Sequence, residues 1–178
     1  MRRLRHSLHV AWLPPHIATI VLPARFTCYP RRVTALPLDD PVVAALLEGP
    51  NLARLAYSGL DGRPRVIPIW FTLLDGDIVM VTGPKASKVR ALEANNAVAL
   101  TIDDARPPYK VLLVEGDAAL EQIDGIAPEY EGITRRFLGA VADAYLSQLK
   151  IKRQVRIRVH PRSFRIFDFV KRYPKSLR

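Results

Sequence analysis

Apolar and polar residues alternate in short runs through most of the chain after residue 50, and glycine, proline or aspartate separates many of these runs. Alternation with a period of two predicts β-strands that bury one face. Seven segments have this β-like character: residues 51–58, 65–74, 78–82, 97–103, 110–121, 154–159 and 163–169. Several connections are short, so we expect antiparallel hairpins, including one that turns at His160-Pro161.

The segment after Leu38 predicts the first helix. Asp39 or Asp40 can cap it, because a carboxylate accepts hydrogen bonds from the free N–H groups of a first helical turn. Pro41 suits the first turn, and Gly49 suits the position after the last. The apolar residues between them can share one face, which predicts a short amphipathic helix.

Two further segments predict helices, residues 87–94 and residues 126–150, the second in two pieces divided near Gly139. Pro68 favours an edge position or a bulge for its strand, because proline cannot donate to a sheet ladder. Gly116 indicates a bulge in the long strand 110–121. Six or seven antiparallel strands with a few helices predict a mainly β, α+β fold, a small barrel with helical covers.

Length and composition indicate one globular domain. The chain has 178 residues, of which 49% are hydrophobic and 25% charged. No apolar run approaches the roughly 20 residues that span a bilayer. Cys28 is the single cysteine, which excludes an intramolecular disulfide framework and fits a reducing cytoplasm.

The formal net charge of +10 is unevenly distributed. Residues 1–35 carry +6, residues 150–178 carry +10, and the segment between them carries −6. The basic character therefore belongs to the two ends. A nucleic-acid groove near the C-terminus stays open as an alternative, but no aromatic-stacking motif or zinc-finger spacing supports it.

Residues 1–35 have neither strand nor helix periodicity, and we expect a disordered extension or a mis-assigned start. Pro14, Pro15 and His16 interrupt what would be the apolar core of a secretion signal. A targeting segment and a structured arm are the alternatives. The folded domain is expected to comprise residues 36–178.

Nucleophilic and metal-dependent sites lack suitable residues in this domain. Of the four histidines only His160 lies outside residues 1–35, and Cys28 also falls within that segment. A Ser-His-Asp, Cys-His or His/Cys metal site is therefore not expected, and no catalytic side chain is assigned. If the protein is an enzyme, a cofactor should carry the chemistry.

A candidate anion site lies at the start of the helix 87–94. Lys85, Ser87 and Lys88 gather where a helix presents free N–H groups and partial positive charge. Two lysines and a hydroxyl at that place suit a phosphate. The loop does not match the GxxxxGK[ST] phosphate-loop motif, and chance surface lysines are the alternative.

The order of these segments resembles the pyridoxamine 5′-phosphate oxidase-like superfamily, which includes F420-binding enzymes of actinobacteria. The resemblance rests on RVIPIWF at 65–71, DGDIVMVTGPKASKVRALEANNAVALTID at 75–103 and VEGDAAL at 114–120, and covers about residues 38–170. It implies an antiparallel split β-barrel of the FMN-binding type.

The resemblance also implies a cofactor site. Arg65 on its strand and Lys88 on the helix correspond to groups that hold the flavin phosphate, with Lys85 and Ser87 in the loop beside them. The strand backbone would follow the ring, and Thr82 would lie near its polar edge. The implied cofactor-binding residues are Arg65, Val66, Ile67, Pro68, Trp70, Thr82, Lys85, Ser87 and Lys88. Vitamin B6 oxidases often have lysine at the position of Trp70, so that specific activity is not expected.

By the same resemblance, the protein is expected to be a homodimeric oxidoreductase that transfers hydride to or from a small organic substrate. FMN is the first choice of cofactor and F420 the alternative. The anionic tail of F420 would need a basic rim, for which Arg156, Arg158, Arg162 and Arg165 are candidates; a solvated strand face is the simpler interpretation of these arginines. Candidates for the dimer interface are Trp70, Phe71, Phe167 and Phe169.

Two other classes of function stay open. A non-catalytic protein that binds or sequesters flavin or haem would use the same barrel, and His160 is the available axial haem ligand in the domain. A nucleic-acid-binding barrel would use the basic C-terminus and show steep salt dependence.

Overall fold

The computed structural model describes residues 31–32, 36–170 and 174. Most of the segment 1–35, for which a disordered extension is expected, lies outside these residues. Within it, Arg31–Arg32 forms a short strand, β1, that pairs with the last strand opposite Phe164 and Ser163.

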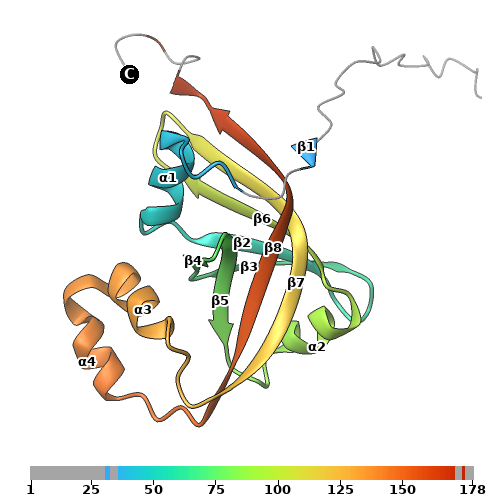
Figure 1. Ribbon diagram of the computed structural model, residues 1–178, viewed down its shortest axis with the longest axis vertical. Helices are drawn as coiled ribbons and strands as arrows, with labels where there is room; N and C mark the ends of the chain where they lie inside the picture. Colours follow the sequence, from blue (N-terminus) through green and yellow to red (C-terminus); the bar gives the residue numbers. More distant parts are fainter. Residues whose placement is uncertain (1–30, 33–35, 171–173, 175–178) are drawn as a thin grey trace, which may run out of the picture.

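One antiparallel sheet forms the body of the described part of the molecule (Figure 1). Its main path runs in the order β3-β2-β6-β7-β8-β5-β4, and β1 adds to β8. The strands of this path are β2 (Ala53–Ser58), β3 (Pro64–Ile69), β4 (Thr72–Leu74), β5 (Asp77–Thr82), β6 (Ala97–Asp104), β7 (Lys110–Asp124) and β8 (Arg153–Asp168).

The two end strands of the path, β3 and β4, are consecutive in sequence and are joined by Trp70 and Phe71. The sheet therefore curls so that its two edges come together at this connection, without β3 and β4 pairing in the described sheet. This is the expected α+β split barrel.

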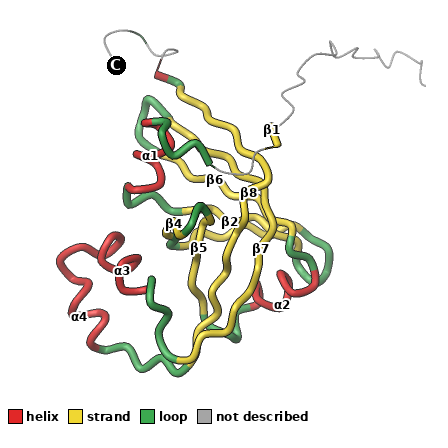
Figure 2. Tube along the Cα trace, in the orientation of Figure 1, coloured by secondary structure: helices red, strands yellow, loops and turns green. Residues whose placement is uncertain are grey.

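Short helices cover the sheet. They are α1 (Pro41–Glu48), α2 (Ser87–Ala94), α3 (Tyr130–Leu138) and α4 (Ala142–Ser147), with a turn of 3₁₀ helix at Gly139–Val141 between the last two. Figure 2 shows α3 and α4 on one side of the long strands and α2 on the other.

Local signals account for these helices. Asp40 caps α1, because its carboxylate accepts hydrogen bonds from the N–H groups of Val42 and Val43. The break near Gly139 is confirmed: this residue has φ of 54°, a left-handed value that ends α3 and is easiest for glycine.

The core lies inside the curled sheet, where alternate residues of each strand point inward. Leu55, Leu100, Leu112 and Ile157 are almost completely buried, and each comes from a different strand. On β8 the predicted alternation is confirmed, because Val155, Ile157 and Val159 are buried while Arg156 and Arg158 face outward.

The predicted turn at His160-Pro161 is wrong. Both residues lie within β8, which runs unbroken from Arg153 to Asp168 beside β7. The ladder shifts register at this place, between Glu115 and Gly116, so the bulge expected at Gly116 is confirmed. A bulge tolerates proline because it already interrupts the ladder.

The single strand expected at 65–74 is instead two strands, β3 and β4. Trp70 leaves the ladder to stack on Phe137 of α3, and Phe71 is fully buried. Packing of these two rings therefore overrides the local strand preference. The edge position expected for Pro68 is confirmed, since β3 ends the sheet. The main path still has seven strands. The segment 65–74 divided into β3 and β4, and the segments 154–159 and 163–169 merged into β8.

Candidate functional site

The start of α2 and the edge strand β3 border a common cavity of about 230 Å³. Arg65 lies on β3 opposite Tyr57, and Ser87 is the first residue of α2. The cavity lining comprises Tyr57, Gly59, Leu60, Asp61, Arg65, Ser87 and Ala91. Two of the predicted phosphate ligands, Arg65 and Ser87, are thus brought together.

The guanidinium of Arg65 is already partnered. Its Nη2 lies 2.8 Å from Oδ2 of Asp61, and Nη1 donates to the carbonyl oxygens of Arg63 and Pro64. The hydrogen bond from Arg65 lowers the pKa of Asp61. Because the two side chains are 43% and 48% exposed, this pair contributes little to stability and can be rearranged by a competing anion.

Lys88 is partly buried, unlike Arg65, Lys85 and Ser87, and it is not among the residues that line this cavity. Burial lowers the pKa of its ammonium group, and in the part of the chain described here the side chain forms no hydrogen bond or ion pair. The residue before α2 is Ala86, which cannot cap the helix with its side chain. A desolvated cation therefore lies in a first turn that has no side-chain cap.

Three further predicted residues, Lys85, Val66 and Ile67, do not line this cavity. Lys85 is exposed on the loop before α2 and lines none of the cavities described here. Val66 is 64% exposed, whereas Ile67 packs against the core. Neither borders the cavity that Arg65 and Ser87 line, so their contribution to a cofactor site would come from the main chain of β3.

An apolar cavity of about 350 Å³ lies at the other end of β3. Its lining includes the predicted residues Pro68 and Trp70, together with residues from β5 and α3. The lining comprises Leu52, Pro68, Ile69, Trp70, Val81, Tyr130 and Ile133. An apolar, partly aromatic surface of this kind suits a planar organic ring.

A second cavity, of about 460 Å³, adjoins the first, because Val81 and Tyr130 line both. The predicted residue Thr82 lies here. The lining comprises Val81, Thr82, Gly83, Pro84, Tyr130, Lys150, Ile151, Lys152, Arg153 and Gln154. This second cavity, hereafter the lysine cavity, is lined by three basic residues, Lys150, Lys152 and Arg153, whereas the first is lined by none.

Tyr130 is held between the two cavities by its neighbours. Its hydroxyl lies 3.1 Å from the hydroxyl of Tyr145, and burial raises its pKa. Trp70 stacks on Phe137 with ring centroids 5.4 Å apart and meets Tyr145 edge-on. These aromatic contacts join α3 and α4 to the end of β3.

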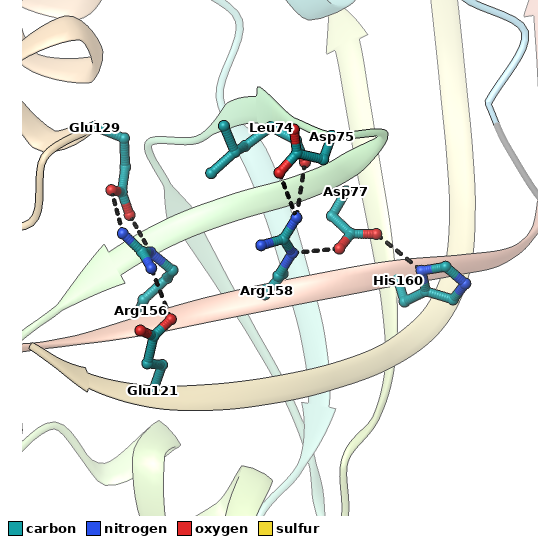
Figure 3. Close-up of polar contacts among 8 residues, drawn as sticks. All are labelled: Leu74, Asp75, Asp77, Glu121, Glu129, Arg156, Arg158 and His160. Atoms are coloured by element: carbon teal, nitrogen blue, oxygen red, sulfur yellow. Dashed lines mark hydrogen bonds and ion pairs between the residues drawn. The ribbon is translucent and has the colours of Figure 1, made fainter.

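An ion pair fixes the start of α3 to the sheet (Figure 3). Nε and Nη2 of Arg156 on β8 lie 2.6 and 2.7 Å from the two carboxylate oxygens of Glu129, the residue before Tyr130. Nη1 of Arg156 donates to Glu121 at 2.6 Å. The hydrogen bond from Arg156 lowers the pKa of Glu129. The wall that contains Tyr130 is therefore anchored to β8.

The four arginines considered for a basic rim are paired with acidic residues. Arg156 binds Glu121 and Glu129, and Arg158 binds Asp75 and Asp77, as Figure 3 shows. Further along β8, Arg162 pairs with Asp117 and Arg165 with Glu115. Their charge is locally compensated, so the idea that they form a free rim for an anionic tail is not supported.

His160, the histidine considered as a haem ligand, contributes to the same network. Its Nδ1 lies 2.9 Å from Oδ1 of Asp77, and it lines none of the cavities described above. No group of three or more histidine, cysteine or acidic residues suitable for a metal occurs within the described ranges. None of the helices described is long and apolar enough to cross a membrane.

Sequence reasoning missed most residues that line these two cavities, among them Leu52, Tyr130, Ile133, Lys150 and Lys152. In the sequence, Tyr130 and Ile133 are ordinary residues of a predicted helix that covers the barrel. Lys150 and Lys152 were visible only as the beginning of a basic tail. Nothing local marks any of them, because the cavities form where β3, β5, α3 and the start of β8 meet.

Comparison with known proteins identifies the family. The profile of the family described as pyridoxamine 5′-phosphate oxidase matches residues 40–165. None of the curated proteins compared with the sequence matches it.

Solved structures share the fold. One described as an F420 reductase is 28% identical, covering 68% of this chain and 94% of that chain, with a TM-score of 0.55. A conserved hypothetical protein of Mycobacterium tuberculosis is 22% identical, covering 80% and 92% of the two chains, with a TM-score of 0.61. The heme storage protein HutZ of Vibrio cholerae is 19% identical, covering 72% and 93%, with a TM-score of 0.53. Since the family match spans most of its length, the chain belongs to the pyridoxamine 5′-phosphate oxidase family.

Proposed function

We propose that this protein is an oxidoreductase that binds FMN, with F420 as the alternative, and transfers hydride to or from a small organic substrate. Membership of a family that includes oxidoreductases supports the proposal, as does the 28% identity to an F420 reductase. The observation that carries it is the cavity of about 230 Å³ at the start of α2, which Arg65 and Ser87 both line.

The residues present fit a phosphorylated cofactor. A phosphate at the start of α2 would accept hydrogen bonds from the first-turn N–H groups and from Ser87, and would compete with Asp61 for Arg65. Lys88, a partly buried cation without a partner in the described structure, would gain a counter-charge. Each charge-assisted hydrogen bond contributes about 1.5–3 kcal/mol.

The ring of the cofactor would lie along the backbone of β3, beside the apolar cavity that Pro68 and Trp70 line, which leaves that cavity open to a substrate. When bound, the flavin or deazaflavin supplies the hydride-accepting centre. The protein contributes the apolar wall, the Tyr130 hydroxyl and the exclusion of water.

A homodimer is part of the proposal. Val66, Tyr109 and Phe167 are 64%, 43% and 38% exposed, so apolar side chains remain at the surface of this single chain. Of the residues considered for an interface, Phe71 belongs to the core, and Trp70 packs within the chain. Phe167 and Phe169 stack with centroids 6.2 Å apart and remain candidates.

The test is to purify the protein, denature it and identify the released small molecule by absorbance and mass. FMN or F420 in near-stoichiometric amount is expected. Release of haem would favour the alternative of a haem-binding protein, although His160 is already hydrogen-bonded to Asp77. A protein that carries no cofactor and also fails to bind added FMN or F420 would contradict the proposal.

A further inference from the structure

The lysine cavity holds positive charge that the rest of the described structure does not compensate. Lys150, Lys152 and Arg153 line it, and no acidic residue does. Arg153 pairs at 3.3 Å with Asp124, whose side chain is 92% exposed. The side chains of Lys150 and Lys152 form no hydrogen bond or ion pair within the described ranges.

This pattern differs from that of the neighbouring arginines of β8. Arg156, Arg158, Arg162 and Arg165 all have carboxylate partners, so the chain provides acidic residues for the cations along this strand. The two lysines at the entrance to the strand lack such partners. An anion from solution or from a ligand is the natural complement for this surface.

The lysine cavity adjoins the apolar one. Val81 and Tyr130 line both, and on the far side of this shared wall lie Leu52, Ile69 and Trp70. A ligand that fills both cavities would have an apolar or planar part against Trp70 and an anionic group near the lysines. The hydroxyl of Tyr130, which lies 3.1 Å from that of Tyr145, provides a polar group between the two.

We propose that the two cavities together bind an organic anion, a molecule with an apolar ring and a carboxylate, phosphate or sulfonate group that Lys150 and Lys152 recognise. This inference rests on the proposed function in one respect: the anion is taken to be the redox substrate. The anionic part of the cofactor has the same chemistry, and the experiment below separates the two sources.

Two fluorescent probes with the same ring system test the inference. Anilinonaphthalene sulfonate carries a sulfonate, and N-phenylnaphthylamine is its uncharged counterpart. In the variant Lys150→Gln/Lys152→Gln, the dissociation constant of the sulfonate is expected to rise about tenfold, because two charged contacts are lost. That of the neutral probe is expected to change by less than about twofold, since its binding depends on apolar area alone.

Two further variants serve as controls. Arg106→Gln/Lys110→Gln removes the same number of positive charges near the opposite end of β7 and should leave both dissociation constants unchanged. Leu52→Trp fills the apolar cavity and should weaken both probes. The inference is overturned if the lysine variant binds the sulfonate as tightly as the unaltered protein does, or if the distant control weakens it equally.

Repeating the titrations with saturating FMN, and then with F420, identifies the source of the anion. If the lysine-dependent binding of the sulfonate persists beside the bound cofactor, the site belongs to a substrate, as proposed. If the cofactor displaces the sulfonate competitively, the lysines hold the cofactor, and the substrate assignment is wrong. If neither cofactor binds but lysine-dependent binding remains, the proposed function fails while the anion site stands.

Discussion

The ion pair between Arg156 and Glu129 offers the sharpest test of how the cavity wall is held. Glu129 precedes Tyr130, and its carboxylate accepts two hydrogen bonds from Arg156, at 2.6 and 2.7 Å. The same guanidinium donates to Glu121 at 2.6 Å. Glu129→Gln and Glu121→Gln therefore each remove one negative charge beside Arg156. The two carboxylates differ in how far they are buried.

Burial sets the expected magnitudes. The side chains of Arg156 and Glu129 are 13% and 9% exposed, whereas that of Glu121 is 57% exposed. Breaking a buried pair by removing one partner costs about 3–5 kcal/mol. Glu129→Gln keeps one acceptor oxygen and leaves Glu121 in place, so we expect a loss of about 2–3 kcal/mol. For the exposed Glu121→Gln we expect less than about 1 kcal/mol.

Urea denaturation of both variants, followed by circular dichroism, measures these losses of unfolding free energy. For a chain of this size, a loss of 2–3 kcal/mol corresponds to a fall in Tm of roughly 4–12 °C. Equal losses for the two variants would show that the environment of the pair does not matter and would refute the reasoning. A double-mutant cycle with Arg156→Met isolates the pairwise energy.

The same pair predicts a dependence on pH. The hydrogen bond from Arg156 lowers the pKa of Glu129 from its ordinary value of 4.5, so the unfolded chain binds this proton more readily than the folded one. The stabilisation is complete above pH 4.5 and is lost as the pH falls through the lowered pKa. The difference in Tm between the unaltered protein and Glu129→Gln should therefore shrink in acid. A constant difference would contradict this assignment.

Three other substitutions test separate features. Lys88→Ala should reduce the FMN retained per protein far more than Lys110→Ala, as measured by released flavin, and equal retention would remove Lys88 from the site. Gly116→Ala should lower the unfolding free energy by about 2 kcal/mol or more, because a Cβ there would lie 2.3 Å from the carbonyl oxygen of His160; an unchanged urea midpoint would contradict this. Arg136→Met should destabilise by about 1–3 kcal/mol in urea, since it leaves two backbone carbonyls without their donor. An unchanged or raised stability would show that losing the unpaired Nε outweighs those two bonds.

Sequence patterns located features that depend on neighbouring residues. The helix at 87–94 has the expected boundaries, Asp40 caps α1 and Gly116 marks a bulge. Each of these rests on steric or hydrogen-bonding rules that act within a few residues. The expected turn at His160-Pro161 failed because pairing with β7 continues past the proline, which no local rule can show.

The candidate site shows the same difference between what local sequence predicts and what long-range contacts decide. Arg65 and Ser87 could be named from the order of segments, and they do border one cavity. The apolar cavity and the lysine cavity could not be named, because Tyr130 and Lys150 reach β3 and β5 only through the way the helices cover the sheet.

Strand alternation, turn residues and helix caps are short-range properties, and they were sufficient to predict an antiparallel barrel. The partners of the charged residues were decided by tertiary contacts. Arg156 meets Glu129 across 27 positions of the chain, and Arg158 meets Asp77 across 81. For this reason the arginines of β8 are paired, whereas Lys150 and Lys152, just before β8, form no ion pair among the described residues.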